Sequence, residues 1–192
     1  RAALFEIYDD QGRSSGRTEA GTAGLVGIHI IVKAPGFPQW IWSTFEQVDN
    51  VTANGEIPSS YNNPNCQGPY CLPSNQSPLQ SGQPFASPNQ ATRLTPLHSE
   101  AIKVNALYRQ ALKDTPFQYY QLVTTQYPLN PRDPGNPLGT PEPNVAANVT
   151  METYIQDTSS CMACHSTARV PGGTLAKTDF SFLLLHAKAP AN

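Results

Sequence analysis

Long apolar runs are missing from this sequence, and charged residues are few. The two longest apolar runs, 24–32 and 180–185, fall far short of the roughly 20 residues that a membrane-spanning helix needs. We therefore expect no transmembrane segment. Only 14% of the 192 residues are charged, and the formal net charge is −2. With so little charge of either sign, neither a nucleic acid nor an anionic membrane surface is an expected partner.

Proline is the residue type in excess. The chain has 19 prolines and 13 glycines, and its proline content is about twice the ordinary usage. Loops should therefore occupy much of the structure. Disorder throughout the chain is excluded, because 39% of the residues are hydrophobic. The length fits one domain over residues 1–192. Because export is expected and no signal sequence stands before Arg1, either a signal peptide has been removed or these residues are the C-terminal part of a longer chain.

Cysteine is scarce, and two of the four cysteines belong to one short run. Residues 161–165 read Cys-Met-Ala-Cys-His, and two thiols and an imidazole at this spacing are the attachment signature of a c-type haem. On one helical turn these three side chains share a face. Cys161 and Cys164 would form thioethers with the haem vinyl groups, and His165 would bind the iron as the proximal ligand. One covalent haem c is therefore the expected cofactor.

Two other kinds of site also use paired cysteines. A four-thiolate zinc site with Cys66 and Cys71 would leave His165 idle, and the two cysteine pairs lie farther apart than in zinc ribbons. A thioredoxin-like redox pair would follow a strand near the start of a βαβ unit, whereas this run comes late in the sequence. Both alternatives are less favoured than haem.

The other two cysteines, Cys66 and Cys71, lie in a loop rich in proline and asparagine. Bacteria attach haem c after export, so the expected location is the periplasm or another exported, oxidising compartment. A short disulfide between these cysteines would hold a segment that has no core of its own. Two free thiols are the alternative, and the compartment favours the disulfide.

Apolar periodicity predicts a few regular elements. A short element at 2–8 ends in a turn, and two antiparallel strands follow, a buried one at 24–33 and a second at 39–48. A helix that Thr95 caps runs from Pro96 to about Asp114, and a strand covers 117–127. A short helix starts near Asn148 or Thr150, Ser159 or Ser160 caps the haem helix, and 179–187 forms a last apolar element.

Loops separate these elements. Residues 50–96 form a long wrapping loop, 128–147 form a proline-rich connector, and 148–187 form the haem-attachment region. The expected fold class is α+β with high irregular content, in which a small antiparallel sheet and a few short helices are wrapped by proline-rich loops around one haem.

Two common cytochrome folds do not fit the sequence. Small electron-transfer cytochromes carry the attachment run near the start and a methionine ligand downstream, but no methionine follows His165. A four-helix bundle needs four long amphipathic helices, and this sequence predicts one such helix. The haem should therefore lie on a different scaffold.

Three segments carry a resemblance to known proteins. They read Pro-Gln-Trp-Ile-Trp-Ser-Thr-Phe-Glu at 38–46, Tyr-Tyr-Gln-Leu-Val at 119–123, and Asn-Val-Thr-Met-Glu-Thr-Tyr at 148–154, just before the attachment run. In these segments and their order, most of residues 24–187 resembles a family of poorly characterised bacterial exported cytochrome c proteins. The resemblance implies a periplasmic or exported monohaem protein without an established reaction. Chains of that family carry additional N-terminal sequence, which implies that Arg1 is not the natural beginning.

The sixth iron ligand decides between electron transfer and ligand chemistry. His29 is the favoured candidate, because it interrupts an apolar strand that could cover a haem face; a core histidine bonded to a backbone carbonyl is the alternative. Met151 is the next candidate, followed by His98 and His186.

The expected function is that of an electron carrier between redox partner proteins rather than an enzyme. Trp40, Trp42 and Tyr154 either line the haem pocket or pack in an ordinary core. A haem enzyme or gas-binding protein with an open distal site, for example of peroxidase type, is the first alternative. The second is a haem-bearing part of a larger structural assembly.

Overall fold

The structure is a computed structural model, and it describes residues 1–9, 13–51, 59–63, 65–67, 75–76, 90–170 and 178–183. In chain order its elements are β1 (Ala2–Tyr8), β2 (Ser14–Thr22), β3 (Gly27–Val32), β4 (Ile41–Gln47), α1 (Ser99–Ala111), the 3-10 helix η1 (Pro116–Tyr119), β5 (Tyr120–Leu129), β6 (Thr140–Glu142) and α2 (Cys161–His165).

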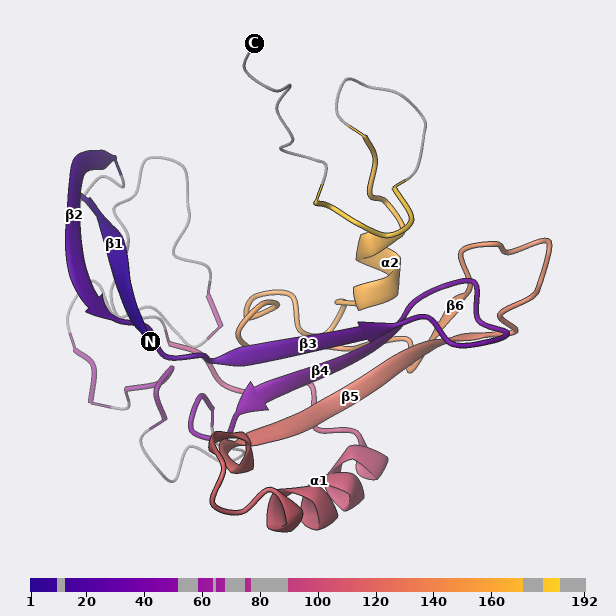
Figure 1. The fold of residues 1–192 in the computed structure, drawn as a ribbon, viewed down its shortest axis with the longest axis horizontal. Coiled ribbons are helices and arrows are strands. Elements are labelled where there is room, and N and C mark those ends of the chain that lie inside the picture. Colours follow the sequence, from indigo (N-terminus) through magenta and orange to yellow (C-terminus); the bar gives the residue numbers. More distant parts are fainter. Residues whose placement is uncertain are drawn as a thin grey trace.

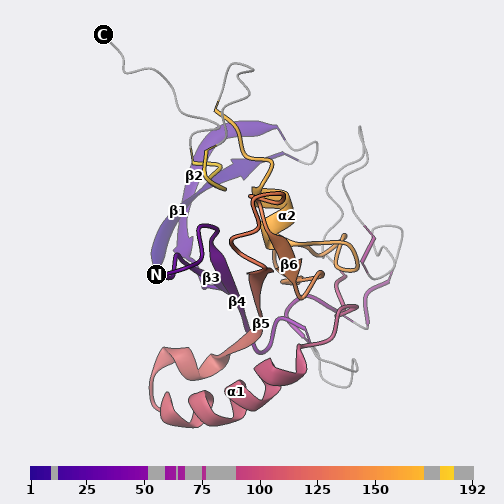
Figure 2. The same cartoon turned by 90° about the vertical axis from the view of Figure 1, so that its right-hand side faces the viewer.

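A four-stranded antiparallel sheet in the order β3-β4-β5-β6 is the centre of the fold. Helix α1 lies against one face of this sheet and α2 against the other (Figures 1 and 2). The α+β class with antiparallel strands and few helices is thus confirmed. No helix within the described ranges is long and apolar enough to cross a membrane.

The strands predicted at 24–33 and 39–48 match β3 and β4. The strand predicted at 117–127 matches β5 from Tyr120 onward, whereas residues 117–119 belong to η1. The expectation that 24–33 is buried is wrong. Strand β3 pairs only with β4 and forms the edge of the sheet. Its Ile30 is 55% exposed and its Val32 is 50% exposed. A run of β-branched residues fits a half-buried strand as well as a fully buried one, so the run alone does not show whether both faces are covered.

Helix α1 begins three residues later than Pro96, at Ser99, and Thr95 does not cap it. The Thr95 hydroxyl instead donates to the backbone carbonyl of Gln156 at 2.6 Å. The backbone N–H of His98, the N-cap residue, donates to the carbonyl of Val123 on β5 at 3.2 Å. These contacts with distant segments keep 95–98 outside the helix, and His98 is extended.

The predicted helix from Asn148 or Thr150, which would carry Met151, Tyr154 and Ile155, is wrong. Residues 149–158 form a series of turns. The side chain of Asn148 accepts the N–H of Thr150 at 2.9 Å, and the Thr153 hydroxyl donates to the carbonyl of Val149. Short polar side chains that bond to the nearby backbone compete with the helical ladder.

Two strands were not predicted. Strand β2 pairs with β1 to form a hairpin that stands apart from the main sheet in Figure 1, and all nine of its residues are exposed. Without a buried face, its sequence has no alternation of apolar and polar residues. Strand β6 lies inside the expected connector 128–147 and pairs with 127–129 of β5, so that connector is not wholly irregular.

Buried polar side chains tie the loops to β4. Glu46 is fully buried, and its carboxylate forms an ion pair with Arg93 and accepts the N–H of Val149. The side-chain amide of Asn148 donates to the Thr44 hydroxyl at 2.8 Å and to the carbonyl of Phe45 at 2.9 Å. The loop before α1 and the turns before α2 are therefore fixed to the same strand.

Candidate functional site

The helix α2 holds the Cys-Met-Ala-Cys-His run, and Ser160 caps it. The Ser160 side chain accepts the N–H of Ala163 at 3.2 Å, whereas Ser159 donates to the carbonyl of Ala146. Met162 points inward, is 1% exposed, and packs with Trp42 and Phe180. Its backbone N–H donates to the side chain of Gln126 on β5 at 2.8 Å. These contacts fix the orientation of α2 on the sheet.

The two thiols and the imidazole of the run line one cavity. Its volume is about 730 Å³, which lies within the range of roughly 300–1,000 Å³ typical of ligand and cofactor sites. The lining comes from β3, β4, α2, the turns before α2, and Phe182, and consists of His29, Ile31, Trp42, Met151, Glu152, Ile155, Thr158, Ser159, Ser160, Cys161, Ala163, Cys164, His165 and Phe182.

The ring of His165 is held by one hydrogen bond and two aromatic contacts. Its Nδ1 lies 2.8 Å from the carbonyl oxygen of Phe180. Because a carbonyl only accepts, Nδ1 carries the proton and Nε2 keeps its lone pair for a metal. The ring centroid lies 4.3 Å from that of Trp42 and 5.1 Å from that of Phe182. A backbone carbonyl that accepts the other ring N–H is a usual orienting partner of a metal-binding histidine.

The two thiols differ in their surroundings, although both are free. Cys164 is exposed, and Cys161 is partly buried. Burial raises the pKa of the Cys161 thiol to about 11, and the negative charge of Glu152 adds to the effect. Glu152 lines the same cavity, and its own pKa is raised by burial. At neutral pH the Cys161 side chain is therefore a thiol and not a thiolate.

This difference predicts unequal alkylation before any haem is attached. At pH 8, iodoacetamide should modify Cys164 at least about ten times faster than Cys161, because the thiolate is the reactive species and Cys161 is rarely ionised. Peptide mass spectrometry of a time course gives both rates in the same sample. Unfolding in urea should remove the difference, and equal rates in the folded protein would contradict the structure.

Two of the candidate sixth ligands reach this cavity. His29 on β3 and Met151 in the turns before α2 both line it. Desolvation lowers the pKa of His29, and the neighbouring His165 lowers it further, so the ring of His29 is neutral at pH 7 and has a lone pair to offer. His98 lies at the start of α1 and is not part of this lining. His186 lies outside the described residues.

Of the three aromatic residues predicted for the haem pocket, one lines the cavity and two do not. Trp42 is buried and lines the cavity. Trp40 packs against the cluster of Trp42, Met162 and Phe180, and its indole N–H donates to the carbonyl of Asp179 at 3.0 Å. Tyr154 is half-buried and does not belong to the lining.

Several lining residues were not predicted from the sequence, among them Ile31, Glu152 and Phe182. Ile31 could have been found, because it lies two residues after His29 on the same strand and therefore on the same face. Glu152 and Phe182 come from irregular segments, which have no periodicity to show where a side chain points.

The chemistry of the cavity fits a haem held through α2. Three of its apolar side chains, Ile31, Met151 and Ile155, are 43%, 66% and 56% exposed, so the cavity presents apolar surface that a porphyrin would cover. Both thiols and the free nitrogen of His165 belong to the same cavity. In the part of the chain that the structure describes, no group of three or more His, Cys, Asp or Glu could hold a metal ion alone.

The predicted pairing of Cys66 with Cys71 stays a prediction, since Cys71 lies outside the described residues.

No protein-family model, curated protein or solved structure matches the chain.

Proposed function

We propose that this chain is an exported monohaem c-type cytochrome that carries single electrons between redox partner proteins. The observation that carries the proposal is that both thiols of Cys161 and Cys164 and the free ring nitrogen of His165 meet in one apolar-walled cavity. The exported location follows from haem c chemistry and from the resemblance to bacterial exported cytochromes.

Each residue has a distinct part in this proposal. When bound, the haem supplies an iron that takes up and releases one electron. Cys161 and Cys164 hold it through thioethers, and His165 ligates its iron. The carbonyl of Phe180 fixes the imidazole tautomer. Trp42 packs on the imidazole and limits its rotation. The apolar part of the lining, which includes Ile31, Met151 and Ile155, would pack against the porphyrin.

The cavity lining favours electron transfer over the enzymatic or gas-binding alternative. Two side chains that can ligate iron, His29 and Met151, line it beside His165, so a second protein ligand is at hand. No arginine belongs to the lining formed by the described residues, whereas a peroxidase-type site uses a distal arginine and histidine. The role as a haem-bearing part of a larger assembly stays a second alternative.

The proposal is tested by expressing the chain in the periplasm of a bacterium that has a cytochrome c maturation system. The intact mass should include one haem, and the haem should resist acid–acetone extraction. The double variant Cys161→Ala/Cys164→Ala should lose the covalent haem completely. The matched control Cys66→Ser/Cys71→Ser removes the other two cysteines and should keep the covalent haem. A wild-type protein without the haem mass, or a double variant that retains it, would refute the proposal.

A further inference from the structure

A second cavity lies on the other face of the sheet, between α1 and strands β3, β4 and β5. Its volume is about 420 Å³. Most of its wall is apolar, with contributions from Ile28, Phe45, Val104, Leu112, Phe117 and Leu122. Only Ala101 of α1 is buried, while Val104 is 37% exposed and Phe117 is 55% exposed. The helix therefore does not close on the sheet, and apolar surface that would gain from being covered faces water.

Arg109 of α1 is the one charged residue among the described residues that line this cavity. Its Nε donates to the carbonyl of Gln118 at 2.9 Å, which fixes the plane of the guanidinium group. Neither terminal nitrogen has a partner within the described part of the chain. A guanidinium held in this way presents two parallel N–H donors, the geometry that matches a carboxylate.

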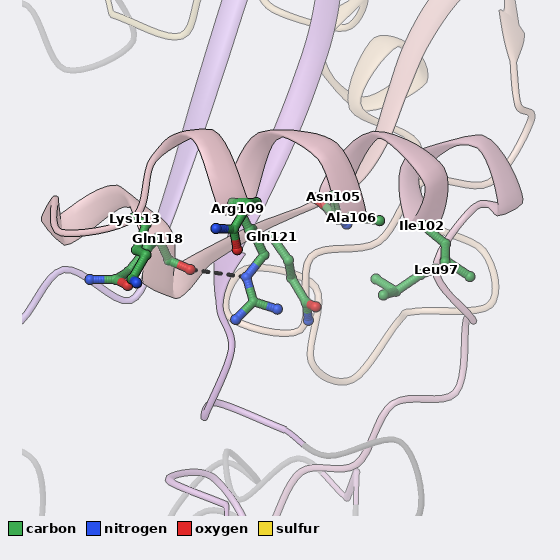
Figure 3. A pocket seen from close by; sticks show the side chains of 9 residues that line it. Leu97, Ile102, Asn105, Ala106, Arg109, Lys113, Gln118 and Gln121 are labelled. Carbon is green, nitrogen blue, oxygen red and sulfur yellow. Dashed lines mark hydrogen bonds between the residues drawn. The ribbon is translucent and has the colours of Figure 1, made fainter.

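Arg109 and Asn105 also line a groove of about 600 Å³ beside this cavity, in which polar and apolar side chains are mixed. Figure 3 shows the guanidinium of Arg109 below the helix, near the side chain of Gln121 and bonded to the carbonyl of Gln118. Lys113, two residues after the end of α1, also lines the groove, and no carboxylate belongs to the described lining. Two cations thus line this groove, and their charge favours a bound anion.

The geometry points to a binding site for a free long-chain carboxylate, with its hydrocarbon chain in the apolar cavity and its carboxylate on Arg109. The volume lies in the usual range for small-ligand sites. A second copy of the chain fits less well, because a symmetric contact through α1 would bring two sets of these cations together. Since α2 lies on the opposite face of the sheet (Figure 1), this site is independent of the haem proposal.

Calorimetric titration of the full, haem-loaded chain with dodecanoate, below its micellar concentration, tests the inference, with dodecanol as the uncharged comparison. Arg109→Gln should weaken dodecanoate binding about ten- to hundredfold, because it removes a charged hydrogen-bonding partner, and should leave dodecanol binding unchanged. Val104→Trp fills the apolar cavity and should weaken both ligands. Lys103→Gln is the matched control, since Lys103 pairs with Glu100 and lines neither the cavity nor the groove.

Circular dichroism checks the fold of every variant, and Arg109→Lys keeps the charge without the planar donor pair if the glutamine variant does not fold. That variant should bind dodecanoate more weakly than the wild type. The inference is overturned if dodecanoate does not bind, or if Arg109→Gln weakens both ligands equally. Binding to neutral phosphatidylcholine vesicles without binding of free dodecanoate would also overturn it, and so would a dimer in sedimentation that Val104→Trp abolishes.

Discussion

Replacing Arg93 by Met should lower the free energy of unfolding by about 3–5 kcal/mol, the usual cost of leaving one charge of a buried ion pair without its partner. The side chain of Glu46 is 0% exposed and that of Arg93 is 7% exposed, so water cannot replace the lost guanidinium. Met has a similar length and fills most of the same volume. Urea unfolding followed by far-ultraviolet circular dichroism measures the change.

Two control variants separate the buried charge from packing. The double variant Glu46→Gln/Arg93→Met removes both charges and should recover much of the lost stability, because no unpaired charge is left. Lys33→Met breaks the exposed pair with Asp179, whose side chains are 40% and 59% exposed, and should cost no more than about 1 kcal/mol. Equal losses for Arg93→Met and Lys33→Met would show that the buried pair is not a main support of the fold.

The buried pair also bears on the site, because the same carboxylate joins three segments. Glu46 on β4 binds Arg93 in the loop before α1 and the backbone of Val149 in the turns before α2. Those turns supply Met151 and Glu152 to the cavity. Loss of the pair should therefore loosen one wall of the haem site before the whole chain unfolds.

Local sequence patterns predicted the parts of the fold that depend on local physics. The dense apolar and aromatic run at 39–48 became β4, and the apolar stripe after Pro96 became α1. Strand β2 lacks any such pattern, because neither of its faces is covered. The start of α1 could not be predicted either, since Thr95 and His98 bond to Gln156 and Val123, which are distant in the sequence.

The candidate site likewise combines residues that local spacing predicts with contacts that only the folded chain brings together. The spacing of Cys161, Cys164 and His165 is local, and one helical turn is enough to bring them to one cavity. The carbonyl of Phe180 that orients His165 lies fifteen residues away in an irregular segment, so only the folded chain reveals it. Glu46 and Thr44 on β4 bind Val149 and Asn148, where a helix was predicted and turns are found. Those turns place Met151 and Glu152 at the cavity.

In the haem-loaded protein, His29→Ala should convert a six-coordinate, low-spin optical spectrum into a high-spin one that responds rapidly to carbon monoxide. The reason is that His29 lines the cavity together with His165, and its ring is neutral at pH 7 because its pKa is lowered. Loss of that ring leaves one coordination position for an outside ligand. Spectra of the oxidised and reduced protein, recorded with and without carbon monoxide, measure the effect.

Met151→Leu is the matched variant, because it removes the other ligating side chain at the cavity while keeping an apolar residue of similar size. If His29 is the ligand, Met151→Leu should keep the low-spin spectrum. A change to high spin in Met151→Leu alone would assign the position to the methionine. Rapid carbon monoxide binding by the wild-type protein would exclude both ligands and favour the enzymatic or gas-binding alternative, because an open iron position is what that chemistry requires.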